Sequence, residues 1–176
     1  MMNTPSDPIR LFFALWPDEL VRDSLSGWPL PCSGRAMSSQ TLHATLVFLG
    51  AVDAARLEAL KLAAAEVVAQ SFELCFDTVR YWGHNHIVYA APGVVPAQLP
   101  HLVGELEYRL IKHHFVFERR EYKPHVTLMR NVHWRDDPFP AMPPVCWRVQ
   151  EFVLLQSEPV QGEAHYRVLA KFRLTE

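Results

Sequence analysis

The sequence uses one short pattern twice, and its residue types suit proton transfer at a phosphate ester. The first copy begins at His43, with Thr45 two positions later, and the second begins at His125, with Thr127 two positions later. Apolar and β-branched residues flank both copies, so both are expected to be strands. Since side chains alternate between the faces of a strand, each histidine should share a face with its threonine. Two such strands facing each other across a cleft would combine two imidazoles and two hydroxyls.

These four side chains could divide the work of opening a phosphate diester. Imidazole has an ordinary pKa near ~6.5, so its neutral and protonated forms are both available at neutral pH. One histidine could take a proton from an attacking water while the other protonates the leaving oxygen. The threonine hydroxyls could donate hydrogen bonds to the non-bridging oxygens as charge develops there. Neither copy contains a carboxylate, which a magnesium-dependent site would need, so we expect no metal and no cofactor.

Simpler interpretations exist for each of these residues. A lone buried histidine is more often a satisfied core residue than a catalyst, and a threonine in a strand is usually a strand former. The repetition of the pattern favours the chemical interpretation. The residues alone do not fix which histidine acts as the acid, and swapped roles fit them equally well.

The composition sets further limits. The chain has 176 residues, of which 49% are hydrophobic and 20% are charged, as in an ordinary soluble globular protein. This length predicts a single domain over residues 1–176, with room for two lobes. The net charge of −2 argues against a protein that wraps long duplex nucleic acid, but not against one that grips a phosphate at a strand end. We expect a monomer.

Cysteine usage and the N-terminus bear on the compartment. The three cysteines, Cys32, Cys75 and Cys146, are odd in number and widely separated. They predict neither a disulfide framework nor a zinc site, with Cys75 a small core residue, which favours a reducing cytoplasm. Met1 to Arg10 has no apolar stretch typical of a signal peptide. No apolar run approaches ~20 residues, so we expect no membrane span.

Hydrophobic periodicity and turn residues predict an alternation of strands and helices. Besides the two motif strands, strands are expected at Ile9 to Trp16, Glu73 to Trp82, Ile87 to Ala91, Trp147 to Gln156 and Tyr166 to Leu174. Helices are expected at Asp18 to Leu25, Ala54 to Gln70 with Asp53 as the N-cap, and Ala97 to His114. The residues from Asp136 to Pro144 hold four prolines and are expected to form an exposed connection.

In their wider context the two motifs resemble the 2H phosphoesterase superfamily, which is named for its two histidines. The resemblance covers nearly the whole chain, and within the superfamily it is strongest to the bacterial RNA 2′,3′-cyclic phosphodiesterases, historically called 2′-5′ RNA ligases. It is carried by Arg10 to Leu15 (RLFFAL), Leu42 to Gly50 (LHATLVFLG), Pro124 to Arg130 (PHVTLMR) and the C-terminal segment from Leu155 to Tyr166.

This resemblance implies an α+β fold with two pseudo-symmetric lobes of antiparallel sheet, helices on the outside and a central active-site cleft. It implies hydrolysis of an RNA 2′,3′-cyclic phosphate end to a 2′-phosphate without a metal. By the family's motif, His43 would be the proton donor and His125 the proton acceptor. Thr45, Thr127 and Arg130 would bind the phosphate.

Two points stay open from the sequence. Strict alternation places Arg130 on the strand face opposite His125, so it reaches the phosphate only if the strand ends, twists or bulges after Thr127. The basic residues Arg119, Arg120 and Lys123 could guide an RNA backbone or form an ordinary solvated edge. Alternative functions are a related 2H activity, such as hydrolysis of small cyclic nucleotides or of 2′-5′ linkages or reversible 2′-5′ ligation, and a non-catalytic RNA-end binding module.

Overall fold

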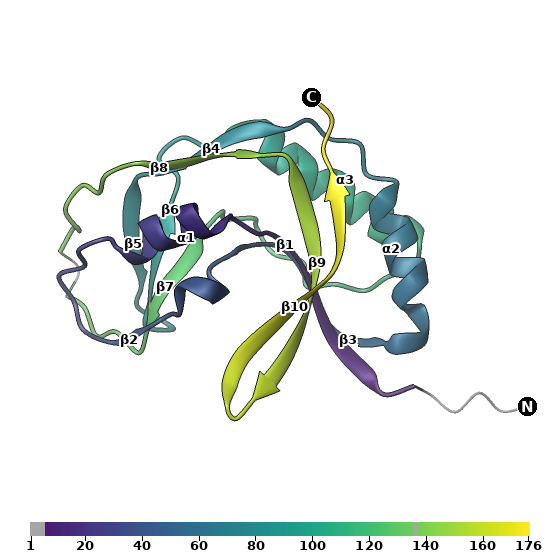
Figure 1. The fold of residues 1–176 in the computed structure, drawn as a ribbon, viewed down its shortest axis with the longest axis horizontal. Coiled ribbons are helices and arrows are strands. Elements are labelled where there is room, and N and C mark those ends of the chain that lie inside the picture. Colours follow the sequence, from purple (N-terminus) through teal and green to yellow (C-terminus); the bar gives the residue numbers. More distant parts are fainter. Residues whose placement is uncertain (1–5, 136) are drawn as a thin grey trace, which may run out of the picture.

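Two four-stranded antiparallel sheets form the frame of the molecule (Figure 1). The computed structural model describes residues 6–135 and 137–176. Residues 1–5, part of the segment predicted not to be a signal peptide, and Asp136, the start of the predicted proline-rich connection, lie outside the described residues. No helix of the described ranges is long and apolar enough to cross a membrane.

The first sheet has the strand order β10-β9-β1-β3, and the second has the order β2-β7-β6-β5. A separate antiparallel pair joins β4 to β8. The strands are β1 (Pro8–Leu15), β2 (Arg35–Ala36), β3 (Ala44–Asp53), β4 (Phe72–Phe76), β5 (Thr78–Trp82), β6 (Ile87–Ala91), β7 (Val126–Arg130), β8 (Val145–Val149), β9 (Glu151–Val160) and β10 (Glu163–Arg173). The motif strands β3 and β7 thus belong to different sheets, and the predicted α+β fold with antiparallel lobes is confirmed.

Within residues 6–135 and 137–176, three α-helices pack beside the sheets. They are α1 (Glu19–Ser26), α2 (Leu57–Ala65) and α3 (Gln98–Lys112), and short 3₁₀ turns lie at Ser39–Thr41 and Ala54–Arg56. In Figure 1, α1 lies on the side of the second sheet, whereas α2 and α3 lie together on the side of the first. In α3 the fully or nearly buried side chains recur at helical spacing, which confirms the predicted apolar face: Leu99, Leu102, Val103, Leu106 and Leu110.

Local capping explains where α1 begins and ends. The Asp18 carboxylate accepts a hydrogen bond from the Val21 amide at 2.9 Å, which satisfies a free donor of the first turn. Gly27 closes the helix, and its amide donates to the Asp23 carbonyl at 2.9 Å. The predicted strand and helix at the start of the chain are therefore confirmed to within one or two residues.

The predicted helix from Ala54 to Gln70 is too long at both ends. Asp53 does cap it, accepting from the Ala55 amide at 2.9 Å, but the first turn is a 3₁₀ turn and the α-helix ends at Ala65. The chain beyond the helix bonds to the C-terminus instead. The Ser71 amide donates to the Thr175 carbonyl at 2.7 Å, and the Thr175 amide donates to Ala69 at 2.9 Å. These distant partners outweigh the helix propensity of the segment.

The predicted strand from Glu73 to Trp82 is two strands in different sheets. The chain bends at Asp77, whose carboxylate accepts hydrogen bonds from the Gly93 amide at 2.7 Å and the Thr78 hydroxyl at 2.9 Å. Upstream, β4 pairs with β8; downstream, β5 forms the predicted hairpin with β6. Only the pairing with different partner strands separates β4 from β5, so the local sequence pattern predicts one continuous strand.

The prediction that the cysteines form no disulfide is wrong. Cys75 and Cys146 lie directly opposite each other in the β4–β8 pair and are joined by a disulfide. Cys75 is therefore not the small buried core residue that was predicted; its side chain is half-exposed at a sheet edge. Since the partners are 71 positions apart, their spacing carried no signal. The cysteine count consequently no longer supports a reducing compartment.

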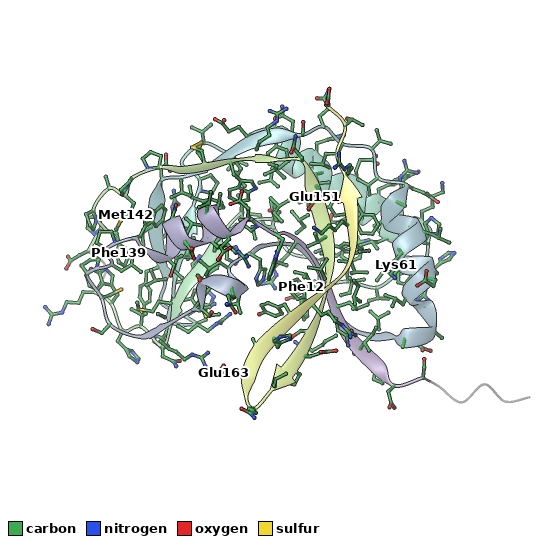
Figure 2. The ribbon with its side chains drawn as sticks, in the orientation of Figure 1. Phe12, Lys61, Phe139, Met142, Glu151 and Glu163 are labelled. Carbon is green, nitrogen blue, oxygen red and sulfur yellow. A yellow bond between two sulfur atoms is a disulfide. The ribbon has the colours of Figure 1, made fainter. Side chains whose placement is uncertain are left out.

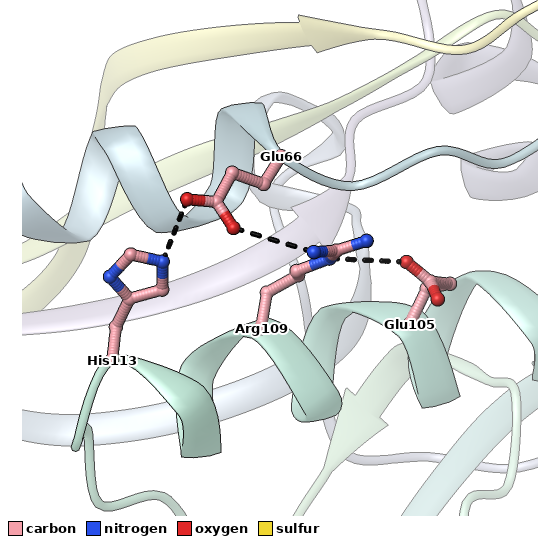
Figure 3. A network of polar contacts seen from close by, with 4 residues as sticks. All are labelled: Glu66, Glu105, Arg109 and His113. Carbon is pink, nitrogen blue, oxygen red and sulfur yellow. Dashed lines mark hydrogen bonds and ion pairs between the residues drawn. The ribbon is translucent and has the colours of Figure 1, made fainter.

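The helices α2 and α3 are tied together at the surface by a chain of polar contacts (Figure 3). Glu66, just after α2, accepts from His113 Nε2 at 2.9 Å and pairs with Arg109 at 3.4 Å, while Arg109 also pairs with Glu105 at 3.4 Å. The hydrogen bond from His113 lowers the pKa of the Glu66 carboxyl. Exposed ion pairs of this kind add little stability, so the packing of the apolar faces holds these helices.

One contiguous core connects both sheets. Its fully buried side chains include Phe13 and Leu154 of the first sheet and Val88 and Val126 of the second. Phe12 points away from this core, and Figure 2 labels it near the middle of the molecule. Burial alternates through both motifs as predicted, with Ala44 and Val126 fully buried beside histidines that are mostly buried. The shared core therefore fixes how the two motif strands face each other.

Candidate active site

The imidazole of His43 is held by the backbone of its own chain. His43 lies immediately before β3, and its Nδ1 atom is 2.7 Å from the Thr41 carbonyl oxygen. Because a carbonyl only accepts, Nδ1 must carry the hydrogen and donate it. The second ring nitrogen, Nε2, is left free to take or give a proton.

His125 repeats this arrangement in the other sheet. It lies immediately before β7, and its Nδ1 atom is 2.7 Å from the Lys123 carbonyl oxygen. In both motifs the bond therefore runs to the residue two positions upstream and selects the same tautomer. Two imidazoles from different sheets are thus prepared in the same way for proton transfer at Nε2.

Aromatic rings surround the two histidines unequally. Three rings pack against His43: Phe12 with centroids 5.1 Å apart, Trp16 at 6.1 Å in a stacked orientation, and Tyr166 at 5.1 Å edge-on. These rings come from β1, the residue after it, and β10. They confine His43 to one orientation and exclude water from much of its surface.

Two rings pack against His125. Trp82 at the end of β5 contacts it edge-on with centroids 4.7 Å apart, and Tyr89 of β6 lies at 5.7 Å. Trp82 and Tyr89 also contact each other, with centroids 4.0 Å apart. The β5–β6 hairpin therefore supports His125 as β1 and β10 support His43.

Burial lowers the pKa of both histidines. For His43 the loss of hydration lowers the pKa to about 4, opposed in part by the bond to Thr41 and assisted by the charges of His125 and Arg130. For His125 burial is again the main cause of a lowered pKa, with smaller contributions from Arg120 and Arg130. Arg130 lowers the pKa of both histidines, so the two imidazoles lie in one electrostatic environment.

A cavity of about 300 Å³, here called the first cavity, brings the five predicted site residues together. His43, Thr45, His125, Thr127 and Arg130 all line it. The rest of its wall is formed by Arg10, Phe12, Met37, Thr41, Phe48, Ser157 and Tyr166. This volume lies at the lower end of the range for small-ligand sites, so the first cavity fits a ligand of about one nucleotide.

A larger cavity of about 570 Å³, here called the second cavity, adjoins the first. The two share Thr45, Phe48, His125, Thr127 and Arg130, whereas His43 lines only the first. The second cavity extends between the β5–β6 hairpin and residues 118–123, and its other lining residues are Leu46, Val47, Trp82, His84, Asn85, Ile87, Glu107, Glu118, Arg120, Glu121, Tyr122 and Lys123.

Arg130 reaches the cavities because β7 bulges after Thr127. Tyr89 pairs with Thr127 but Val88 pairs with Met129, so Leu128 has no opposite residue. One extra residue shifts the alternation, which turns Arg130 to the face that carries Thr127. The bulge was one of the conditions under which the sequence allowed Arg130 to face the site.

A close backbone approach holds this arginine in place. Arg35 of the two-residue strand β2 pairs with Arg130, and Gly34 precedes it. A Cβ atom on Gly34 would lie 2.7 Å from the Arg130 carbonyl oxygen, so no larger residue fits there without a shift. Gly34 is thus a supporting position that the sequence did not reveal.

The sequence did not indicate which aromatic rings contact the two histidines. It also did not indicate which of the basic residues before the second motif line a cavity. Trp16, Trp82 and Tyr166 contact the histidines only through tertiary packing. Of the basic residues before the second motif, Arg120 and Lys123 line the second cavity. Arg119 lines neither cavity, and its guanidinium instead lies 5.5 Å from the Phe117 ring centroid.

The donor set around the first cavity suits an anion. Among the described residues that line it, none carries a carboxylate. Among all described residues, one potential ligand group of three appears, formed by Glu73 with Cys75 and Cys146, and the disulfide occupies both sulfur atoms. The first cavity therefore offers cations and hydroxyls, as phosphate binding requires.

Comparison with known proteins places the chain in a family. Residues 23–161 match the family described as the 2′-5′ RNA ligase superfamily. The chain belongs to this superfamily. The 2H phosphoesterase resemblance of the two motifs is thereby confirmed.

Two curated relatives of this chain carry the same name, RNA 2′,3′-cyclic phosphodiesterase. The protein from Escherichia coli (strain K12) is 29% identical over 178 aligned residues, covering 97% of this chain and 99% of the relative. The protein from Bacillus subtilis (strain 168) is 28% identical over 144 residues, covering 76% of each.

Solved structures agree with this placement. E. coli LigT complexed with 3′-AMP has a TM-score of 0.85 at 28% identity, covering 97% of this chain and 100% of LigT. E. coli LigT complexed with phosphate gives 0.82 at 29% identity with the same coverage. A protein of Thermus thermophilus, TT0787, gives 0.72 at 25% identity, covering 94% of this chain and 97% of that one. The fold is thus that of LigT.

Proposed function

We propose that the protein hydrolyses the 2′,3′-cyclic phosphate at the end of an RNA strand and leaves a 2′-phosphate. The observation that carries this proposal is the convergence of two tautomer-fixed histidines from different sheets on one cavity lined by hydroxyls and Arg130. The activity in the names of the E. coli and B. subtilis relatives is the one this arrangement suits.

His125 acts as the general base and His43 as the general acid. His125 Nε2 takes a proton from water, whose oxygen forms the new bond to phosphorus. The bond from phosphorus to the 3′-oxygen breaks, and that oxygen takes the proton from His43 Nε2. The 2′-oxygen keeps the phosphate, and proton exchange with solvent restores the starting forms. Each positioned proton transfer contributes roughly 10²–10⁴-fold to the rate.

Because its pKa is lowered, His43 can act as the general acid only after it gains a proton. With a pKa of about 4, His43 is neutral in the free protein at neutral pH. The negative charge of a bound phosphate favours the imidazolium, so substrate binding raises the pKa and brings the proton to His43. The order itself is proposed from the family's motif, and a pH profile of single histidine variants distinguishes it from the reverse.

Thr45, Thr127 and Arg130 stabilise the charge that develops on the phosphate. The two hydroxyls donate to non-bridging oxygens, and the guanidinium can donate to two oxygens at once. These groups and the imidazolium supply the positive charge that a metal would otherwise provide. We therefore propose that the reaction needs no metal and no cofactor.

The direct test uses an oligoribonucleotide with a 2′,3′-cyclic phosphate end, incubated with the purified protein in EDTA. We expect a 2′-phosphate end, identified by chromatography against 2′- and 3′-phosphate standards. A 3′-phosphate product, or turnover only after adding a divalent metal, would contradict the mechanism. An unchanged end despite tight binding would favour the binding-module alternative.

All residues of the site come from one chain, so no second copy is required to complete it. We accordingly propose a monomer. As a separate proposal, on which the site geometry has no bearing, we propose that the protein acts on RNA ends in the cytoplasm. Analytical ultracentrifugation during turnover checks the first point, since an active dimer would contradict it. Fractionation of cells that produce the protein checks the second.

A further inference from the structure

In the proposed reaction, the terminal nucleotide of the substrate occupies only the first of the two adjoining cavities. The cyclic phosphate belongs where they meet, beside His125, Thr127 and Arg130, which line both. His43 must reach the departing 3′-oxygen, and it lines only the first cavity, so the terminal ribose lies on that side. The second cavity, of about 570 Å³, is left beside the phosphate without a role.

We infer that the second cavity binds the nucleotide that precedes the cyclic-phosphate nucleotide in the RNA strand. This inference rests on the proposed function and names the preferred substrate, an oligonucleotide end rather than a free cyclic mononucleotide. Phe48 lines both cavities, and the guanidinium of Arg10 lies 5.2 Å from its ring centroid. A strand that crosses Phe48 would pass from the first cavity into the second.

The walls of the second cavity match a nucleobase. Trp82 supplies an indole that is itself fixed against Tyr89 and His125, so stacking a base on it costs little ordering. Ile87 adds an apolar surface, and Asn85 and His84 at the hairpin turn add groups that can hydrogen-bond to a base edge. Flat apolar surface combined with edge donors and acceptors is the chemistry of base recognition.

The basic residues at the rim of the second cavity suit the one phosphodiester that links the preceding nucleotide to the terminal nucleotide. Arg120 and Lys123 line the cavity and are exposed. In the free protein Arg120 pairs with Glu118 at 2.7 Å and Lys123 pairs with Glu121 at 3.8 Å. Exposed pairs of this kind are weak, so a phosphodiester can replace either carboxylate as the partner. The nearby carboxylates also make this rim unsuitable for a long run of phosphates.

The test compares kcat/KM for three substrates: adenosine 2′,3′-cyclic phosphate, its 5′-phosphorylated form, and the dinucleotide ApA ending in a 2′,3′-cyclic phosphate. We expect the dinucleotide to exceed the unphosphorylated mononucleotide by about tenfold or more, as one stacked base and one phosphate contact would give. The 5′-phosphorylated mononucleotide should fall between them, because it offers the phosphate without the base.

Substitutions in the second cavity test which residues cause the preference for the dinucleotide. Trp82→Ala should remove most of the advantage of the dinucleotide over the 5′-phosphorylated mononucleotide, and Arg120→Gln most of the advantage gained from the 5′-phosphate. Because Trp82 touches His125, the ratio between substrates is read and not the absolute rate. Arg119→Gln is the matched control, since this neighbouring exposed arginine lines neither cavity. It should leave every ratio unchanged.

The outcomes separate the two proposals. Equal kcat/KM on mononucleotide and dinucleotide would overturn the inference and leave the proposed function standing. A dinucleotide advantage that survives both Trp82→Ala and Arg120→Gln would likewise overturn it, because the preceding nucleotide would then bind elsewhere. No hydrolysis of any cyclic end, including longer oligoribonucleotides, would overturn the proposed function and the inference with it.

Discussion

The two histidine motifs have the same backbone arrangement but different surroundings. Both imidazoles donate from Nδ1 to a carbonyl two residues upstream at 2.7 Å, and both precede a strand. His43 is enclosed by three aromatic rings and His125 by two. The larger loss of hydration lowers the pKa of His43 to about 4. The repeated motif thus fixes the tautomer and direction of each imidazole, while the neighbouring rings set its proton affinity.

The largest expected effect comes from removing either histidine. His43→Ala and His125→Ala should each lower kcat on a cyclic phosphate end by at least roughly 10²–10⁴-fold, since each removes one proton transfer. Steady-state kinetics measures the loss, and circular dichroism checks the fold. The control is His101→Ala, an exposed histidine on α3. If only one of the two site variants lost activity, the motifs would not be the matched pair described above.

The threonines test whether the two motifs contribute equally to charge stabilisation. Thr45→Val and Thr127→Val should each reduce kcat by about 10²-fold, because each removes one donor to the developing charge. Thr45→Ser and Thr127→Ser keep the hydroxyl and should recover most of the rate. Equal rates for the valine and serine variants would mean that the hydroxyls only fill space in the strands.

The unequal surroundings should appear in the pH dependence of stability. A buried histidine whose folded pKa is lowered stabilises the protein fully above the unfolded pKa near 6.5, and the contribution is lost as pH falls toward the folded pKa. For His43 the shift to about 4 corresponds to a loss of about 3 kcal/mol in the free energy of unfolding.

Urea unfolding at pH 7.5 and pH 4.5 measures this loss, and each variant is compared with the wild type to cancel shared contributions. His43→Gln should flatten the pH dependence more than His125→Gln does. Equal flattening would contradict the inequality between the two sites, and a steeper dependence in His43→Gln would reverse it.

The smallest expected effect lies in the segment that leads into the second motif. The Tyr122 hydroxyl is buried and has no hydrogen-bond partner among the described residues, whereas Thr41, in the corresponding segment of the first motif, has its hydroxyl bonded to the Ser38 carbonyl at 2.8 Å. Burial raises the pKa of Tyr122. Tyr122→Phe removes an unsatisfied group and should raise the free energy of unfolding by about 1 kcal/mol. A loss of similar size would mean that the hydroxyl has a partner in solution.

Sequence patterns predicted the parts of the fold that depend on local periodicity. The first strand, α1, α3, the β5–β6 hairpin and both motif strands were recognisable because each carries its own apolar spacing and turn residues. The early end of α2 and the separation of β4 from β5 could not be predicted, because hydrogen bonds to Thr175 and Gly93 decide them. The disulfide follows from the β4–β8 register, which no local pattern specifies.

The site divides in the same way. The motif residues could be proposed from their types and spacing, and the faces of Thr45 and Thr127 followed from strand alternation. The position of Arg130 depended on a bulge that shifts the β7 register at Leu128. The rings of Trp16, Trp82 and Tyr166 reach the histidines only because strands distant in the sequence pack together. The candidate catalytic residues could therefore be predicted from the sequence. The bulge and the aromatic rings that set their orientation and pKa values could not.

The convergence of both motif imidazoles on one phosphate group can be measured by ¹⁵N NMR of histidine-labelled protein titrated with adenosine 2′-monophosphate, a mimic of the proposed product. We predict that the Nε2 resonances of His43 and His125 shift along one binding curve and that both pKa values rise on saturation. A response from only one of the two, or two different dissociation constants, would contradict a shared phosphate site.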